Sequence, residues 1–290
     1  MTTDYLIKAL AYDGKIRAYA IRSTELTNEL QQSHKTTPVA SAALGRAATI
    51  GAMMGAMLKG EEKLTIQIKG DGPVGQIIID ANSKGIVRGY ITNGQVDLPL
   101  NAKGKLDVAS AIGQGYLYVV KDLGLKDYYT GNVPLISGEL GEDFTYYFTH
   151  SEQTPSAIGV GVLVNPDYKI RAAGGFIIQI LPGVDEELVN QIEKKLSTMD
   201  SVTSLIDHGL SPEQILEQLL GEIQVLERMK IQFQCNCSYE RIDNMLIGLG
   251  KDEIEDLIEK EGKAQIICQF CNKEYHYQRE DLERLLVEFS

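Results

Sequence analysis

The chain has 290 residues, 43% of them hydrophobic, which is enough for about two domains and at least one full core. Its formal net charge is −12, and residues 181–260 alone hold 17 acidic and 7 basic side chains. Because phosphate binding needs an excess of Lys and Arg, we expect no nucleic-acid partner. Residues 1–20 contain no uninterrupted apolar run typical of a signal peptide, which predicts a cytoplasmic protein.

The first long apolar segment, residues 39–58, is rich in alanine and carries small residues four apart: Ala47, Gly51 and Gly55. It also contains Arg46, which would be costly at the centre of a bilayer. We therefore interpret it as a helix buried in a core, whose small face lets another element approach closely. The sequence predicts no membrane partner.

Short runs rich in β-branched or aromatic residues follow, separated by turn residues, and these predict antiparallel strands. The predicted strands cover residues 64–69, 76–81, 86–92, 144–149, 158–164 and 176–180. The segment 70–75 fits the dinucleotide pattern G-x-G-x-x-G, but a strand follows it rather than a helix, so it predicts a hairpin turn. The fold class is therefore α+β, with a mixed α/β domain and an antiparallel sheet in residues 1–180.

After residue 180 the pattern becomes helical. Apolar residues recur at spacings of three and four over 184–199 and 212–230, which predicts an acidic, amphipathic helical linker at 181–230. Ser211 precedes Pro212, an arrangement typical of an N-cap followed by proline in the first turn of a helix.

Residues 231–290 form a third predicted domain, too small to be stable on its apolar core alone. We expect Ser238 to cap a helix over 239–249, with further helices over 251–260 and 281–289 and a strand over 274–278. His276 in that strand is interpreted as a surface or packed residue. All four cysteines of the chain lie in this domain: Cys235, Cys237, Cys268 and Cys271.

Two close thiol pairs that meet across a small domain match the tetrahedral, sulfur-only coordination of structural zinc. The first pair has a one-residue spacer, which differs from the usual two. Four thiolates leave no open position for water or substrate, so we expect one structural or regulatory Zn²⁺, name no catalytic residue and expect no enzyme.

Zinc would tie the segment 235–237 to the segment 268–271. Disulfides within each pair would remove that tie, and the strained bond across one residue would be easy to reduce again. The sequence alone leaves three disulfide connectivities open. It thus permits a reversible redox switch, with a permanent zinc staple as the alternative.

The cysteine motifs, Cys-Asn-Cys-Ser at 235–238 and Cys-Gln-Phe-Cys at 268–271, resemble those of the thirty-three-kilodalton heat-shock protein family, the redox-regulated holdase chaperones of bacteria. Supporting similarity lies in KGDGPVG at 69–75, SEQTPSA at 151–157 and GGFIIQILPG at 174–183, and the resemblance covers essentially the full length. It implies that the reduced, zinc-bound form is inactive. It further implies that oxidants and unfolding stress expel zinc and pair Cys235 with Cys237 and Cys268 with Cys271.

The resemblance also implies that the zinc domain and the linker then unfold, and that the protein dimerises and holds unfolding proteins without ATP. A linker released from a sheet would expose apolar residues to such clients. The candidate client-binding residues are Ile215, Leu219, Ile223, Leu226 and Met229. Two alternatives remain: a thiol-disulfide oxidoreductase using the C-x-x-C at 268–271, and a zinc-stapled RNA-binding module, which the acidity disfavours.

Overall fold

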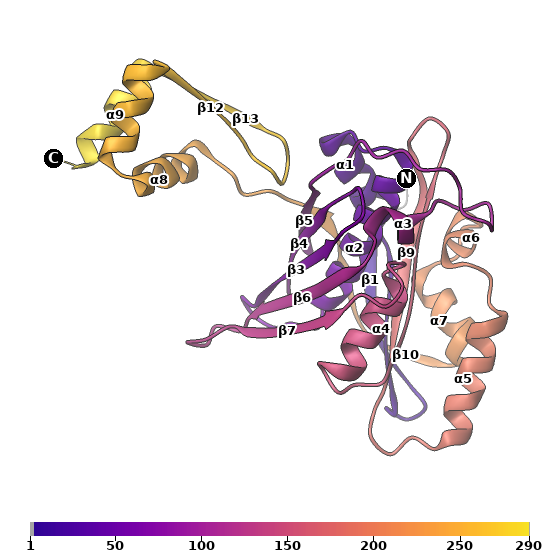
Figure 1. The fold of residues 1–290 in the computed structure, drawn as a ribbon. Helices are drawn as coiled ribbons and strands as arrows, with labels where there is room; N and C mark the ends of the chain where they lie inside the picture. Colours follow the sequence, from indigo (N-terminus) through magenta and orange to yellow (C-terminus); the bar gives the residue numbers. More distant parts are fainter. Residues whose placement is uncertain (1–2, 290) are drawn as a thin grey trace. The chain divides into compact units, whose positions relative to one another are not determined.

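The computed structural model describes residues 3–289 (Figure 1). The chain divides into two compact units between Gln234 and Cys235. The strands of the first unit are β1 (Tyr5–Ala11), β2 (Ile16–Arg22), β3 (Lys63–Gly70), β4 (Gln76–Asn82), β5 (Ile86–Ile91), β6 (Gly115–Asp122), β7 (Tyr129–Pro134), β8 (Ser156–Val164), β9 (Ile170–Ile180), β10 (Ile223–Lys230) and β11 (Gln232–Phe233). Its helices are α1 (Thr24–His34), α2 (Pro38–Gly55), α3 (Val108–Ile112), α4 (Gly141–His150), α5 (Glu186–Thr198), α6 (Val202–Asp207) and α7 (Pro212–Leu220).

The strands of the first unit form two sheets. Sheet A has the order β10-β1-β2-β9-β8 and sheet B the order β11-β5-β4-β3-β6-β7. Neighbouring strands are antiparallel except for β11 and β5. The predicted hairpin turn at 70–75 is confirmed, because Lys69 of β3 lies opposite Gln76 of β4. The predicted α+β class is confirmed as well.

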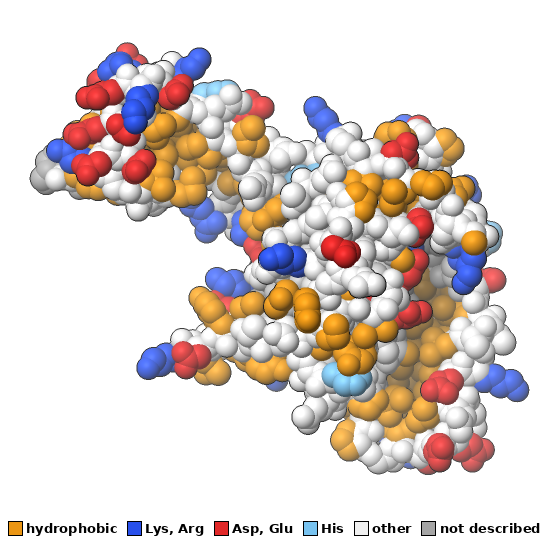
Figure 2. Space-filling view, in the orientation of Figure 1, with side chains coloured by type: hydrophobic (Ala, Val, Ile, Leu, Met, Phe, Trp, Pro, Cys, Tyr) orange, Lys and Arg blue, Asp and Glu red, His pale blue; other side chains and the backbone are white. Residues whose placement is uncertain are grey.

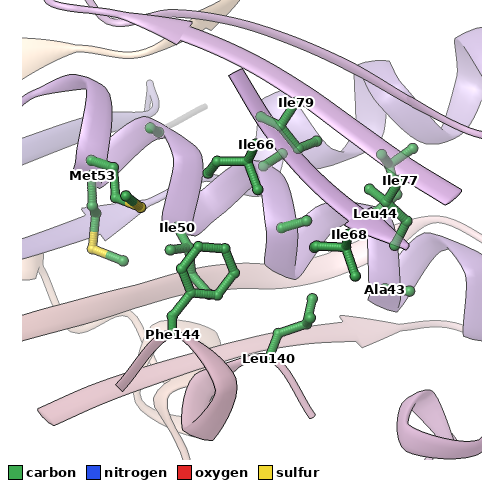
Figure 3. Close-up of a cluster of buried hydrophobic side chains, with 14 of the residues drawn as sticks. Ala43, Leu44, Ile50, Met53, Ile66, Ile68, Ile77, Ile79, Leu140 and Phe144 are labelled. Carbon is green, nitrogen blue, oxygen red and sulfur yellow. The ribbon is translucent and has the colours of Figure 1, made fainter. Parts of the chain in front are cut away.

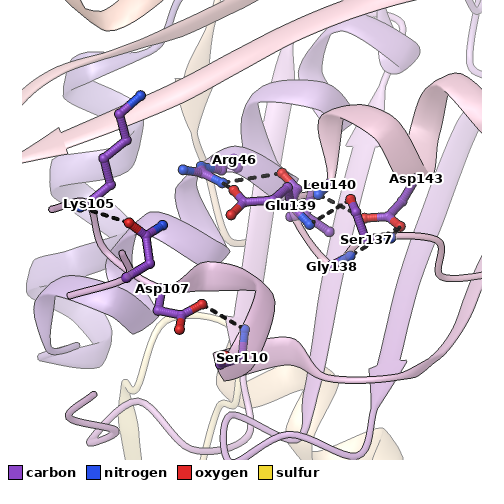
Figure 4. A network of polar contacts seen from close by, with 10 residues as sticks. Arg46, Lys105, Asp107, Ser110, Ser137, Gly138, Glu139, Leu140 and Asp143 are labelled. Carbon is purple, nitrogen blue, oxygen red and sulfur yellow. Dashed lines mark hydrogen bonds and ion pairs between the residues drawn. The ribbon is translucent and has the colours of Figure 1, made fainter. Parts of the chain in front are cut away.

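Helix α2 lies between the two sheets and contacts strands of both, which explains why nearly every residue of it is buried. Its small residues allow the close approach that the sequence predicts. A Cβ atom added at Gly51 would lie 2.7 Å from the Ile79 side chain of β4, so sheet B packs directly on this helix (Figure 3). Arg46 of this helix forms an ion pair with Glu139 (Figure 4). Within residues 3–289, no helix is long and apolar enough to span a membrane.

The predicted strand over 144–149 is wrong, because this segment lies in helix α4. Its aromatic residues suggested a strand, but Phe144, Tyr147 and Phe148 are buried on one face of the helix. Asp143 fixes the start of the helix, since its buried carboxylate accepts backbone N–H groups of the preceding loop (Figure 4). The donors are Ile136, Ser137, Gly138 and Leu140.

Helices α5, α6 and α7 pack on the other face of sheet A, where their apolar side chains form a second buried cluster with β1, β2 and β9. The N-cap predicted at Ser211 is confirmed, because its hydroxyl accepts the Gln214 N–H at 3.3 Å. The predicted helix over 212–230 is wrong beyond Leu220. Gly221, with φ of 80°, ends α7, and the following residues pair with β1 as strand β10.

The second unit contains α8 (Tyr239–Leu249), α9 (Lys251–Lys260), β12 (Lys263–Ile267), β13 (Glu274–Gln278), α10 (Arg279–Leu286) and a 3₁₀ turn (Val287–Phe289). Charged side chains gather over α9 on the face shown in Figure 2. The predicted helices over 239–249 and 251–260 and the strand over 274–278 are confirmed, and the last helix begins two residues earlier than predicted. The predicted division of the chain at 180/181 and 230/231 stays a prediction.

Candidate metal centre

The first thiol pair lies at the start of the second unit, directly before helix α8. Cys235 and Cys237 flank Asn236, and Ser238 follows as the N-cap of α8. The Ser238 hydroxyl accepts the Arg241 N–H at 3.3 Å, which confirms the predicted cap. The cap fixes where the helix begins and so holds Cys237 at its amino end.

The second thiol pair lies in the tight turn that joins β12 to β13. The Cys268 N–H donates to the Lys273 carbonyl at 3.0 Å, and the Asn272 N–H donates back to the Cys268 carbonyl at 2.8 Å. Asn272 adopts a left-handed conformation with φ of 55°, which asparagine tolerates better than most residues. The turn therefore places Cys268 and Cys271 on one loop, where both can approach Cys235 and Cys237.

The four sulfur atoms converge. All of them lie within 4.8 Å of one another, and each side chain is partly buried. Between the two pairs, the Cys235 and Cys268 sulfurs are 3.7 Å apart and the Cys237 and Cys271 sulfurs 3.3 Å apart. Zn–S bonds of about 2.3 Å in a tetrahedron would place the sulfurs roughly 3.8 Å apart, so the donor set and spacing fit one Zn²⁺.

Burial and neighbouring groups shift the pKa values of three of these thiols. Burial raises the pKa of Cys235 and of Cys271. Burial also acts to raise the pKa of Cys237, but hydrogen bonding by the Tyr275 hydroxyl and by neighbouring thiols outweighs it and lowers this pKa to about 7. Four adjacent thiols cannot all ionise unless a cation compensates their charge, and a divalent metal ion supplies that compensation.

Tyr275 is a residue of this centre that the sequence analysis missed. It is fully buried on β13, and its ring meets Tyr239 edge-on at 4.9 Å. The Cys237 sulfur beside its hydroxyl raises the pKa of Tyr275 well above its ordinary value. The alternation of Tyr275 and Tyr277 around exposed His276 indicated a buried face that could have been recognised. His276 itself is on the surface, as expected.

The five candidate client-binding residues do not share one face. Ile215 and Leu219 are fully buried on α7, where they contact sheet A. Ile223 and Met229 are partly buried on β10. Leu226 is 56% exposed, because the β1–β10 register shifts from Glu227 opposite Lys8 to Val225 opposite Ala9 and leaves it as a bulge. Whether these residues bind clients stays a prediction.

Comparison with known proteins gives consistent matches over nearly the whole chain. Residues 4–278 match the family model described as Hsp33 protein. The 33 kDa chaperonin of Geobacillus kaustophilus (strain HTA426) is 61% identical over 285 residues, 97% of each chain, and that of Bacillus subtilis (strain 168) is 57% identical over 284 residues, 97% of this chain and 98% of the relative. The crystal structure of the 33 kDa chaperonin from Thermotoga maritima matches with a TM-score of 0.93 at 40% identity and covers 99% of both chains.

Proposed function

Because this chain belongs to the Hsp33 family of chaperones, we propose that it is a redox-regulated holdase that protects unfolding and oxidatively damaged proteins from aggregation without ATP. The observation that carries the proposal is the convergence of four sulfurs within 4.8 Å in a unit with a small apolar core. A site of this composition can hold a metal ion, and it can also be oxidised. The same four side chains can therefore stabilise the folded second unit when they bind a metal ion and allow it to unfold when they are oxidised.

In the reduced state, Cys235, Cys237, Cys268 and Cys271 hold one Zn²⁺ as thiolates. The bound ion supplies positive charge and a rigid tie between the loop before α8 and the turn between β12 and β13. Metal binding of this kind contributes about 10–16 kcal/mol of apparent folding free energy in small zinc domains. The second unit is then folded and the chaperone is inactive.

In the oxidised state, the four thiolates lose four electrons and form two disulfide bonds. Two equivalents of peroxide accept these electrons, take up four protons and yield four water molecules. We propose that the bonds join Cys235 with Cys237 and Cys268 with Cys271. This pairing leaves the metal without ligands and removes the tie between the two segments, whereas bonds between Cys235 and Cys268 or Cys237 and Cys271 would preserve it.

Unfolding of the second unit would allow the linker, residues 181–230, to detach and bind clients. Its helices α5–α7 bury apolar side chains against sheet A, including Ile215 and Leu219. Their release would uncover both the linker residues and the sheet face beneath them, and exposed apolar surface binds unfolded chains. We propose that the oxidised protein dimerises, and that the switch operates in the cytoplasm, whose reducing potential keeps the thiols zinc-bound until stress.

A combined assay tests the proposal on the full-length, zinc-loaded protein. Zinc release is followed with a chromogenic chelator, and thiols are counted, while peroxide is added at elevated temperature and the aggregation of an unfolding client is read by light scattering. We expect one zinc and four thiols to be lost as scattering is suppressed, and reductant with zinc to reverse both. Zinc release with unchanged scattering would leave only a structural role for the site.

A thiol-disulfide oxidoreductase is a second candidate, favoured by the lowered pKa of Cys237 of about 7. Zinc would mask this nucleophile, so the two candidates differ in their dependence on the metal. Turnover of a small disulfide substrate by the isolated protein would support the oxidoreductase, whereas stable retention of zinc during turnover would count against it.

A further inference from the structure

Two buried tyrosines of strand β13, Tyr275 and Tyr277, differ in what their hydroxyl groups can bond. Both side chains are fully buried, and both belong to the apolar cluster of the second unit. Because they alternate with exposed His276 along the strand, they lie on the same face of it. A comparison of the two therefore isolates the role of the hydroxyl group from that of the ring.

The Tyr277 hydroxyl has an ordinary protein partner. It donates to the Asp243 carboxylate at 2.7 Å, and the Tyr239 carbonyl lies 3.5 Å from it. Both partners belong to helix α8, so this hydroxyl ties β13 to that helix. Its role is structural and does not involve the thiols.

The Tyr275 hydroxyl lacks such a partner. It is buried, and it forms no hydrogen bond with an oxygen or nitrogen atom of the described residues. The Cys237 sulfur lies beside it, and the Cys237 side chain packs against the same apolar cluster. A buried donor without an acceptor is destabilising, and a phenol has one proton to donate. A thiolate at Cys237 would supply the acceptor.

The Tyr275 ring is held in position by its neighbours. Tyr239 meets it edge-on with the ring centroids 4.9 Å apart, and the Lys273 ammonium lies 5.1 Å from its centroid. Only Ser238, the N-cap of α8, separates Tyr239 from Cys237 in the chain. The residues that fix the first thiol pair therefore also fix the ring, and the hydroxyl is pre-organised beside the sulfur.

A hydrogen bond donated to a thiolate stabilises the anion and makes its sulfur less nucleophilic. This matters for oxidation, because the Cys237 sulfur must use an electron pair to attack one oxygen of peroxide. The O–O bond then breaks, the sulfur becomes a sulfenic acid, and the other oxygen leaves as hydroxide, which takes up a proton to form water. A hydrogen-bonded thiolate makes this attack more slowly than a free one.

We propose that Tyr275 is a positioning residue of the redox switch: its hydroxyl donates a hydrogen bond to the Cys237 thiolate and slows the oxidation of the first thiol pair. The inference rests on the proposed redox regulation, for which it names a residue that sets the rate. The hydrogen bond itself belongs to the reduced protein and can be measured without a client or an oxidant.

Alkylation of the full-length, reduced, zinc-loaded protein tests the proposal at each cysteine. Iodoacetamide is added below one equivalent, so that a sulfur–carbon bond forms and iodide leaves at only a small fraction of the sites. The remaining thiols are then labelled with deuterated reagent after denaturation, and tandem mass spectrometry gives the early alkylation at each position. Cys268 is the internal reference for Cys237, because it packs against the same cluster but belongs to the other thiol pair.

Tyr275→Phe is the decisive variant, and Tyr277→Phe is its matched control. A hydrogen bond to a charged group changes an equilibrium by roughly ten- to a hundredfold, and nucleophilicity follows basicity with an exponent of about 0.4–0.5. We therefore expect Tyr275→Phe to raise the ratio of Cys237 to Cys268 alkylation about three- to eightfold. The loss of the Cys237 thiol to peroxide should become faster by a similar factor.

Tyr277→Phe removes the bond to Asp243 and should lower the melting temperature of the second unit without changing that ratio. Three results would overturn the proposal: an unchanged ratio in Tyr275→Phe, equal acceleration at all four cysteines, or the same rise in Tyr277→Phe. The last two would show that the variant only loosens the unit.

A measurement on the wild type decides the matter if Tyr275→Phe does not fold. In proton NMR spectra of the reduced, zinc-loaded protein, the Tyr275 hydroxyl proton should exchange slowly with water and show a nuclear Overhauser effect to the Cys237 β-protons. A hydroxyl proton in rapid exchange, or one without this effect, would contradict the hydrogen bond.

The same variant separates this inference from the proposed function. If the oxidised wild type suppresses client aggregation but Tyr275→Phe is alkylated and oxidised like the wild type, the inference fails and the holdase proposal stands. If the oxidised wild type does not suppress aggregation while Tyr275→Phe still raises Cys237 alkylation selectively, the hydrogen bond is established and the holdase proposal fails.

Discussion

The two units of the chain are stabilised in different ways. The first unit has large buried clusters on both faces of sheet A, and the cluster around α2 alone extends over both sheets. In the second unit, the described residues bury only a small cluster around Ile254, Tyr275 and Leu282, beside the four thiols. A core of that size is marginal without a metal or disulfide. We therefore expect the second unit to unfold before the first when its thiols lose their metal.

The largest expected effect is that of metal removal. With zinc chelated under reducing conditions, we expect hydrogen exchange to become fast throughout residues 235–289 and to remain slow in α2 and the strands that pack on it. The expected loss of folding free energy in the second unit is about 10 kcal/mol or more, which exceeds what its apolar core can supply. Retained protection in α8 and α9 after chelation would mean that the small core suffices and that the two units do not differ in this way.

A second effect tests whether the linker is secured by its buried residues. Ile215→Ala deletes a fully buried side chain from the α7–sheet A contact, and we expect the first unit to lose about 2–5 kcal/mol in urea unfolding. Leu226→Ala, at the exposed bulge of β10, is the matched control and should change stability by less than about 0.5 kcal/mol. In the oxidised protein, Ile215→Ala should also lower the peroxide needed for holdase activity, since the linker detaches more easily. Equal effects of the two variants would contradict the placement of the linker.

The sequence predicted the metal centre better than the linker, for a physical reason. Cysteine spacing is a local signal, and Ser238 with the turn after Cys271 organises each pair from its own neighbours. The periodicity of Ile215, Leu219 and Ile223 was also correct as a pattern, but it continued across Gly221, where the chain changes from helix to strand. Strand β10 depends on pairing with β1, some 220 residues earlier in the chain, which no local pattern reveals. The burial of Tyr275 against Tyr239 likewise arises only from tertiary contacts.

The third effect concerns pH and should be confined to the first unit. Burial raises the pKa of Asp4 to about 6 from an ordinary value of 3.8, although the Leu26 N–H bonds its carboxylate at 2.8 Å and Arg22 lies nearby; Glu25 adds to the rise. The folded state therefore holds the proton more tightly than the unfolded state. This contribution to stability is greatest below about pH 4 and is lost as the pH rises through 6.

Asp4→Asn removes the charge that is unfavourable at neutral pH. We expect the variant to be more stable than wild type at pH 7.5, by up to about 3 kcal/mol, with the difference shrinking as the pH falls toward 4. Urea unfolding followed by circular dichroism at several pH values measures this, and Asp97→Asn, on an exposed loop, is the control. A constant difference across the pH range would show that the charge of Asp4 is not its cause.

The smallest effect compares the same substitution in the two units. Ser211→Ala removes the N-cap of α7 in the first unit, and Ser238→Ala removes that of α8, next to Cys237, in the second. Each should cost about 1 kcal/mol, but the readouts should differ. Ser238→Ala should lower the temperature at which peroxide releases zinc, because the cap fixes the end of the helix that follows the first thiol pair. Ser211→Ala should leave zinc release unchanged and weaken only the packing of α7. If both variants shift the zinc-release temperature equally, zinc release depends on the stability of the linker as well as on that of the second unit. The two units would then unfold as one cooperative system.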